Sequence, residues 1–396
     1  MWQKAKNIYH LFVAIFANVL YGFPAQKLTV IGVTGTDGKT TTTSLIYHIL
    51  KENGYPASLI STVGAVIHGK TSDIGFHVTN PSSLPLQRFL SHVVKQKDRY
   101  LVLEVTSHGL DQNRVWGIPF AIGVLTNITH EHLDYHKTYD NYAKTKIRLL
   151  NSAKVAVVNS DDGSYKEVSK YLRDKKKLIT YALDKKADIT AKDIKIPDHF
   201  LGKHNAYNAL AAIGVARKIG IPEAGIQKAL LTFVFPKGRG EIVYKKDFTL
   251  MIDFAHTPNA FEQLLSSLRP TVAGRLIHVF GSAGARDNTK RPLMGEVASA
   301  YDDIVILTSE DPRHEKPEKI INEIEMGMNT KNHVQIFEIV DRKAAIEKAV
   351  SLAQKGDYIV LTGKAHEKSN NMGHGEDPWD EFNVAAEAIK KYAKTN

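Results

Sequence analysis

The sequence predicts an α/β protein with two successive units, each built on a mostly parallel sheet, and three observations lead to this fold class. Short apolar strands alternate with amphipathic helices, which is the pattern of a parallel sheet covered on both faces. The first strand runs into a glycine-rich turn and then a helix. The chain has 396 residues, more than one hydrophobic core usually serves.

The strand pattern divides the chain near Pro236, where glycine and proline cluster after a helical run. The first part, residues 27–236, contains strands expected at 28–33, 100–105, 122–126 and 155–158. A helix expected at 40–50 follows the first strand. The second part, residues 237–396, contains strands expected at 249–253, 276–280, 303–307 and 358–361.

Residues 1–26 precede the first strand, and we interpret them as an apolar helix. Their segment 8–23 has no charged residue and follows two lysines, as in a signal peptide, but the glycine-rich strand and turn come almost at once. We therefore reject secretion and expect a cytoplasmic protein. The segment contains His10 and Asn18 and is marginal for a bilayer span. Two alternatives stay open: a helix that packs on the next domain, which we favour, and peripheral membrane contact.

The composition limits the classes of function. The chain has no cysteine, which excludes disulfides, cysteine nucleophiles and thiolate metal sites and fits a reducing cytosol. Its net charge is +10, but the lysines are scattered and no aromatic residues interleave with a basic stripe. We therefore expect no nucleic-acid partner. A basic surface instead attracts anionic substrates or an anionic membrane face.

The glycine-rich turn at residues 32–41 reads Gly-Val-Thr-Gly-Thr-Asp-Gly-Lys-Thr-Thr. Glycines let backbone N–H groups approach an anion, Lys39 adds a point charge, and the Thr40 hydroxyl suits Mg²⁺. The spacing departs from the usual P-loop because Gly32 lies one position early. The strand before the turn and the helix after it are still the context that the motif needs. The turn therefore predicts a site for ATP and Mg²⁺.

Polar residues follow the next two strands of the first part. Glu104 ends one strand and leads into 105–114, and the other strand leads into the histidine-rich segment 126–136. Ligands collect at the carboxyl ends of strands in α/β sheets, and a carboxylate beside a phosphate site suits Mg²⁺. Because there is no His-Glu-x-x-His helix and the phosphate-binding turn is present, we expect magnesium rather than zinc.

Taken in series, several motifs closely resemble the Mur ligases, and among these the members that add the third residue of the peptidoglycan stem peptide. The motifs lie at 32–41, 104–114, 126–136, 253–258, 290–295 and 310–313. The resemblance implies a central P-loop ATPase domain followed by a Rossmann-like α/β domain. It also implies a first domain that holds the UDP part of the substrate, for which the residues before Gly32 leave no room.

The reaction that the resemblance implies is ATP-dependent amide formation through an acyl phosphate. Both steps concentrate negative charge, so cations must be in place. By resemblance, Lys39 contacts the β- and γ-phosphates, Thr40 and Glu104 hold one Mg²⁺, and His132 helps to hold a second. Lys146 matches the lysine that these ligases carbamylate, which converts a cation into a magnesium ligand.

Further residues match positions that contact ATP in the family. Arg286 resembles a residue that closes over the phosphates and is expected to be catalytic with Lys39, Lys146 and His132. The residues expected at ATP are Gly35, Thr36, Asp37, Gly38, Lys39, Thr40, Thr41, Asn127, Asn205, Asn208, Arg286 and Lys290.

The substrates that the resemblance implies are small molecules: UDP-N-acetylmuramoyl-L-Ala-D-Glu and an amino acid. Arg313 stands where diaminopimelate-adding members clamp a carboxylate, so we favour meso-diaminopimelate over lysine, although Glu310 and Asp311 depart from the usual Asp-Asn-Pro-Arg. Two alternatives are a different acceptor, lipid-linked or polymeric, and a non-catalytic nucleotide-binding scaffold. The residues expected at the substrates are Thr79, Asn80, Thr106, Ser107, Gln112, Arg114, Asp311, Arg313, Gly363 and Glu367.

Overall fold

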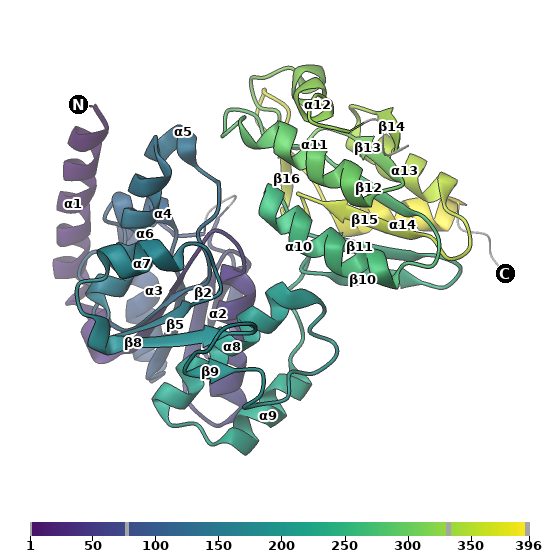
Figure 1. Ribbon diagram of the computed structural model, residues 1–396. Coiled ribbons are helices and arrows are strands. Elements are labelled where there is room, and N and C mark those ends of the chain that lie inside the picture. The colour runs from purple at the N-terminus through teal and green to yellow at the C-terminus, as the bar shows by residue number, and fades with distance from the viewer. Residues whose placement is uncertain (1, 76–78, 330–333, 393–396) are drawn as a thin grey trace. The chain divides into compact units, whose positions relative to one another are not determined.

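The computed structural model describes residues 2–75, 79–329 and 334–392 and divides the chain into two compact units (Figure 1). The first unit consists of residues 1–129 and 136–236, and the second of residues 130–135 and 237–396. Each unit has a mostly parallel sheet with helices packed against it, which confirms the predicted α/β class.

The first unit contains one nine-stranded sheet. Its strands are β1 (Thr29–Thr34), β2 (Ala57–Ser61), β3 (Gly64–Ile67), β4 (Lys70–Ser72), β5 (Tyr100–Glu104), β6 (Phe120–Leu125), β7 (Val155–Asn159), β8 (Leu178–Ala182) and β9 (Ile189–Thr190). They run in the order β4-β3-β2-β5-β1-β6-β7-β8-β9. All neighbours from β2 to β9 are parallel, and the β2–β3 and β3–β4 pairs are antiparallel.

Helices cover both faces of this sheet because side chains alternate between its faces along each strand. Ile31 and Val33 of β1 pack with the helices that follow the phosphate-binding turn and precede Pro236, whereas Val30 packs on the other face. The helices of this unit are α1 (Trp2–Tyr21), α2 (Lys39–Glu52), α3 (Ser83–Lys95), α4 (Ser107–Asp111), α6 (Tyr139–Ser152), α7 (Tyr165–Tyr171), α8 (Gly202–Ile219) and α9 (Glu223–Thr232). Helix α5 (Leu133–His136) lies largely in the second unit.

The second unit has a six-stranded sheet in the order β10-β11-β15-β12-β13-β14. Only the edge pair β10–β11 is antiparallel among its described strands. These strands are β10 (Glu241–Lys245), β11 (Thr249–Asp253), β12 (Leu276–Phe280), β13 (Ile304–Leu307), β14 (Gln335–Glu338) and β15 (Tyr358–Thr362), and a small hairpin joins β16 (Ser369–Asn371) to β17 (Glu376–Pro378). The helices are α10 (Pro258–Leu268), α11 (Lys290–Tyr301), α12 (Pro317–Glu325), α13 (Arg342–Leu352) and α14 (Glu381–Tyr392).

Helix α1 packs on the first unit through one side only. Ala14, Ala17 and Asn18 are buried, and the Asn18 side chain donates to the carbonyl of Trp116 at 3.0 Å. Packing, the alternative that the sequence favoured, is therefore observed on this side. No helix among the described residues is both long and apolar enough to cross a membrane.

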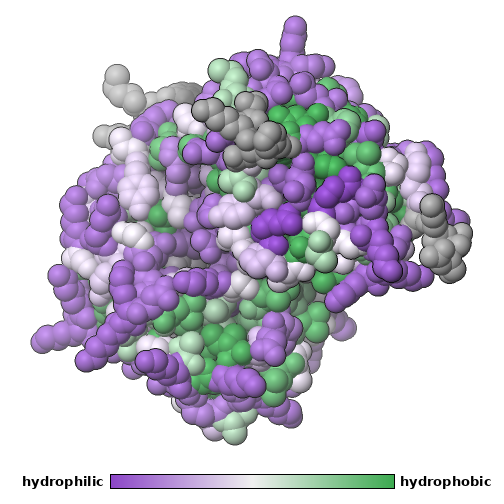
Figure 2. Space-filling model, turned by 45° about the vertical axis from the view of Figure 1, so that its right-hand side comes forward, coloured by the Kyte–Doolittle hydropathy of each residue, from purple (hydrophilic) through white to green (hydrophobic). Residues whose placement is uncertain are grey.

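Exposed surface elsewhere is mainly polar. On the face that Figure 2 shows, hydrophilic side chains predominate and hydrophobic ones lie in patches between them. Most of the large apolar side chains instead fill the cores on either side of each sheet.

Candidate active site

The phosphate-binding turn joins β1 to α2 in the first unit, and its glycines have no space for side chains. Gly38 has φ +78°, and a Cβ there would lie 2.3 Å from Oδ1 of Asn208. A Cβ on Gly35 would lie 1.8 Å from Oγ1 of Thr126. The hydroxyl of Thr126 also donates to the carbonyl of Asp37 at 2.7 Å. Only glycine allows this close approach of backbone and neighbours.

Further hydrogen bonds involve other polar groups of the turn. The Asp37 N–H donates to Oδ1 of Asn127 at 2.9 Å, and the Thr36 hydroxyl accepts from the N–H of Thr129 at 3.0 Å. Lys39, at the start of α2, folds back and donates to the carbonyl of Thr36 at 2.8 Å. The turn is thus fixed in shape with a lysine ammonium beside it.

Glu104, at the carboxyl end of β5, is buried at 1 % exposure. It accepts from the Thr40 hydroxyl at 3.0 Å and from the Thr62 N–H and hydroxyl at 2.9 and 3.0 Å. No cationic side chain pairs with it within the part of the chain that the structure describes. A buried carboxylate with only neutral partners is costly, and a bound cation would remove that cost. The Thr40–Glu104 pair therefore fits a hard divalent metal.

Lys146 brings a second charged group to the same turn from α6. Its side chain is buried, its Nζ donates to the carbonyl of Gly35 at 2.6 Å, and it lies 4.5 Å from the ring centroid of Tyr142. Lys144, two residues earlier, is half exposed and pairs with Asp140 at 2.6 Å. Of these two lysines, only Lys146 contacts the phosphate-binding turn.

Helix α8 supplies two of the asparagines that are expected at ATP. Asn208 accepts from the Thr42 hydroxyl at 3.1 Å and donates to Oδ1 of Asn205 at 3.3 Å. Asn205 in turn donates to the carbonyl of Leu201 at 2.9 Å. Asn208 therefore contacts the turn directly and Asn205 lies next to it. Thr41 is buried in the first turn of α2.

The residues expected at the muramoyl-peptide also come together, around the end of β5. Asn80 donates to the carbonyl of Glu104 at 2.5 Å and accepts from the Thr106 N–H at 2.6 Å. Arg114 donates to the carbonyl of Asn80 at 2.6 Å and to Oε1 of Gln112 at 3.0 Å. The Thr79 hydroxyl forms a hydrogen bond with the Thr62 hydroxyl at 2.9 Å, and the buried Ser107 hydroxyl has no partner within the described part of the chain.

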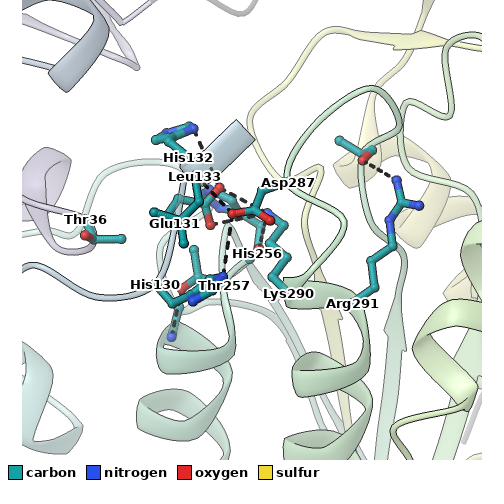
Figure 3. Close-up of polar contacts among 12 residues, drawn as sticks. Thr36, His130, Glu131, His132, Leu133, His256, Thr257, Asp287, Lys290 and Arg291 are labelled. Atoms are coloured by element: carbon teal, nitrogen blue, oxygen red, sulfur yellow. Dashed lines mark hydrogen bonds and ion pairs between the residues drawn. The ribbon is translucent and has the colours of Figure 1, made fainter. Parts of the chain in front are cut away.

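In the second unit, the segment 130–135 lies against the start of α11 (Figure 3). Glu131 and Lys290 are both buried, and Nζ of Lys290 lies 3.4 Å from Oε1 of Glu131. Nδ1 of His132 lies 3.8 Å from the same oxygen. The Leu133 N–H donates to Oδ2 of Asp287 at 3.1 Å. The structure thus brings together two predicted residues, His132 and Lys290.

Arg286 precedes α11 and lies near charges of both signs. Burial, with the nearby charge of Arg313, lowers the pKa of the Arg286 guanidinium, and the carboxylates of Asp134 and Glu131 oppose this effect. The guanidinium remains charged at neutral pH. Two neighbouring arginines that repel each other favour an anionic ligand between them.

The residues expected at the incoming amino acid cluster around Lys364, which the sequence reasoning missed. Lys364 is fully buried, and its Nζ donates to Oδ1 of Asp311 at 2.9 Å and to Oε2 of Glu367 at 2.7 Å. The Arg313 guanidinium donates to the carbonyl of Gly284 at 2.9 Å. The available signal was the position of Lys364 between Gly363 and Glu367.

Gly363 and Glu310 share one tight space in this cluster. Gly363 has φ +97°, and a Cβ there would lie 1.9 Å from Oε2 of Glu310. Burial, opposed by Arg342 and Lys290, raises the pKa of the Glu310 carboxyl to about 8. Glu310 is therefore protonated in most molecules at neutral pH.

The chain is similar in sequence to known proteins over both of its units. The chain matches the Mur ligase middle domain over residues 33–216 and the Mur ligase glutamate ligase domain over residues 238–365. It is 40% identical over 400 residues to UDP-N-acetylmuramoyl-L-alanyl-D-glutamate--2,6-diaminopimelate ligase 1 of Clostridium acetobutylicum, covering 96% of this chain and 82% of that protein. The UDP-N-acetylmuramoyl-L-alanyl-D-glutamate--2,6-diaminopimelate ligase of Aquifex aeolicus is 38% identical, covering 94% of this chain and 80% of that protein.

Solved structures share the fold, and one of them is also related in sequence. A structure of a UDP-N-acetylmuramoyl-L-alanyl-D-glutamate--2,6-diaminopimelate ligase superimposes with a TM-score of 0.60 at 32% identity, covering 92% of this chain and 78% of that chain. Folylpolyglutamate synthase of Mycobacterium tuberculosis shares the fold at a TM-score of 0.70 and 17% identity, covering 97% and 95%. The chain, with its two matched domains and its relatives, belongs to the Mur ligase family.

Proposed function

We propose that this chain is an ATP-dependent ligase of peptidoglycan precursor synthesis that joins meso-diaminopimelate to UDP-N-acetylmuramoyl-L-Ala-D-Glu in the cytoplasm. The observation that carries this proposal is the charged cluster of Asp311, Arg313, Lys364 and Glu367, which lies on loops after β13 and β15. Relatives between 35% and 40% identical bear the name of this reaction.

The cluster suits an amino acid with a second head group. Meso-diaminopimelate carries an ammonium and a carboxylate at each end, and one end remains free when the amine of the other end reacts. The Arg313 guanidinium forms no ion pair within the described residues, so it has donors for that carboxylate. Asp311 and Glu367 supply negative charge for the ammonium. L-Lysine has the amine but lacks the second carboxylate, so it would leave Arg313 without its ligand.

ATP is proposed to bind the turn at residues 35–41. Backbone N–H groups at the start of α2 would bind a phosphate there, Lys39 would add positive charge, and Asn127, Asn205 and Asn208 would extend the site. Thr40, Glu104 and Lys146, if Lys146 is carbamylated, would hold Mg²⁺, and His132 would contribute to a second ion. Bound Mg²⁺ supplies positive charge that offsets the negative charge developing on the phosphates.

The proposed chemistry has two steps. A carboxylate oxygen of the acceptor bonds the γ-phosphorus, the bond to ADP breaks, and an acyl phosphate forms. The neutral amine of the amino acid then bonds the acyl carbon, the carbon–oxygen bond to phosphate breaks, and the amine loses a proton. Arg286 and Lys290 are proposed to stabilise the charge on the transferred phosphoryl group. The division into an ATP-binding domain at 27–236 and a C-terminal domain at 237–396 is part of this proposal.

The test is ADP release by purified protein with UDP-N-acetylmuramoyl-L-Ala-D-Glu, offered meso-diaminopimelate or L-lysine in parallel, with the product identified by mass. The proposal expects turnover with meso-diaminopimelate and little with L-lysine. Turnover with lysine alone would overturn the amino-acid assignment. If neither is used although ATP binds, the acceptor is a different one, lipid-linked or polymeric.

A further inference from the structure

Helix α1 has an outward side that is apolar throughout. Ile8, Phe12, Phe16 and Leu20 follow one another at four-residue spacing and are 57 %, 67 %, 59 % and 58 % exposed. Because residues four apart share one side of a helix, they form a continuous stripe opposite the buried residues Ala14 and Asn18. Tyr9 and Val19 widen the stripe. We call these six exposed residues the α1 outer face; Figure 1 shows α1 at the margin of the first unit.

The α1 outer face is unusual on this protein. Within the described residues, sixteen large apolar side chains are exposed, and six of them lie on this one helix. Leu84 and Trp116 are also exposed, and they belong to segments that contact α1. Single exposed apolar residues need no explanation, but a contiguous group on a helix marks an interaction surface.

The surroundings of this face are basic. The chain has no Asp or Glu before Asp37 and none between residues 79 and 97, so neither α1 nor α3 contains an acid. Helix α3 packs against α1 and exposes Arg88, His92 and Lys95. One acidic residue, Asp111, contacts α1: its carboxylate accepts a hydrogen bond from the Asn7 side chain at 2.8 Å. The same carboxylate lies 3.9 Å from the Arg148 guanidinium.

We propose that the α1 outer face docks on an anionic lipid surface, with α1 lying in the plane of the interface and the basic residues of α3 at the headgroups. An apolar helix side with aromatic residues beside cationic ones is the chemistry that such surfaces bind. A second copy of the chain fits less well. A symmetric dimer through this face would bring two acid-free basic edges together.

The test is sedimentation of the full chain with vesicles of phosphatidylcholine alone or of phosphatidylcholine with phosphatidylglycerol. Phe12→Ser/Phe16→Ser removes apolar area without changing charge, and Arg88→Gln/Lys95→Gln removes charge without changing the face. The matched control is Leu231→Ser/Val234→Ser, because both residues are exposed and lie outside α1 and α3. All the substituted side chains are exposed, and thermal midpoints verify that each variant folds.

We expect binding to the anionic vesicles only, a loss of about tenfold or more in Phe12→Ser/Phe16→Ser, and binding by the control like that of the unchanged chain. Arg88→Gln/Lys95→Gln should weaken binding and flatten its salt dependence. The proposal is overturned if Phe12→Ser/Phe16→Ser binds as well as the unchanged chain. It is also overturned if light scattering shows a dimer that this variant alone dissociates. ADP release with soluble substrates should be unchanged in all three variants, which separates this proposal from the proposed ligase function.

Discussion

Lys146 of α6 donates through its buried Nζ to the backbone carbonyl of Gly35, at 2.6 Å. A lysine more than 100 residues away in sequence therefore contacts the phosphate-binding turn. The Nζ of Lys146 also lies 4.5 Å from the ring centroid of Tyr142. Carbamylation would turn it into a metal ligand at the phosphate-binding turn, which also contains Thr40.

The Lys146→Ala variant should therefore lose ADP release by about 100-fold or more, because a metal ligand is lost. Acetate added to this variant should restore part of the activity, since a small carboxylate can occupy the space left by the side chain. The matched control is Lys144→Ala, whose half-exposed side chain pairs with Asp140 and should leave turnover unchanged. Equal activities of the two variants would refute the role of Lys146.

Glu104→Gln keeps the shape of the side chain and removes its charge. We expect the Mg²⁺ concentration for half-maximal ADP release to rise by about 10- to 100-fold. The free energy of unfolding without Mg²⁺ should stay the same or rise, because the buried carboxylate has only neutral partners. A Mg²⁺ titration and urea unfolding measure the two effects. An unchanged Mg²⁺ requirement would exclude Glu104 as a ligand.

Arg313→Ala should raise the KM for meso-diaminopimelate by about 10- to 100-fold, the equivalent of a charged hydrogen bond worth about 1.5–3 kcal/mol. The preference over L-lysine should shrink by a similar factor, because the clamp for the second carboxylate is gone. Lys343→Ala, which removes an exposed cation paired with Glu387 in the same unit, serves as control. If selectivity survives in Arg313→Ala, the carboxylate is recognised elsewhere.

The raised pKa of Glu310 predicts that the free energy of unfolding depends on pH. Its pKa is raised to about 8 in the folded chain by burial, whereas an exposed glutamate has a pKa of about 4.5. The folded state therefore binds this proton more tightly, and the stabilisation is complete below pH 4.5 and decreases as pH rises to about 8. Urea unfolding at several pH values should show a smaller decrease in Glu310→Gln than in the unchanged chain. Parallel curves would contradict this assignment.

The sequence predicted best the strands and helices whose positions depend on neighbouring residues in the chain. The strand, turn and helix at residues 28–50 depend on local glycine spacing and apolar pattern, and the observed β1 and α2 agree within two residues. The strands at 249–253 and 276–280 were predicted at their observed bounds for the same reason. Local sequence is enough in these segments because the pattern that predicts each element lies within that element or directly beside it.

Features that depend on contacts between distant segments could not be predicted from the sequence. The burial of Lys364 requires Asp311, which lies on a loop after a different strand. The grouping of residues 130–135 with the second unit likewise rests on contacts such as that of Leu133 with Asp287. In α1, the apolar run covers nearly the whole helix, so the sequence alone could not tell which side packs and which is exposed.

The most direct measurement follows oxygen from the acceptor into phosphate. UDP-N-acetylmuramoyl-L-Ala-D-Glu labelled with ¹⁸O in its reacting carboxylate is incubated with the chain, ATP, Mg²⁺ and meso-diaminopimelate, and the phosphate and the product are weighed by mass spectrometry. We expect ¹⁸O in the released phosphate together with the amide of meso-diaminopimelate. Phosphate that carries oxygen only from water, without an amide product, would contradict this expectation.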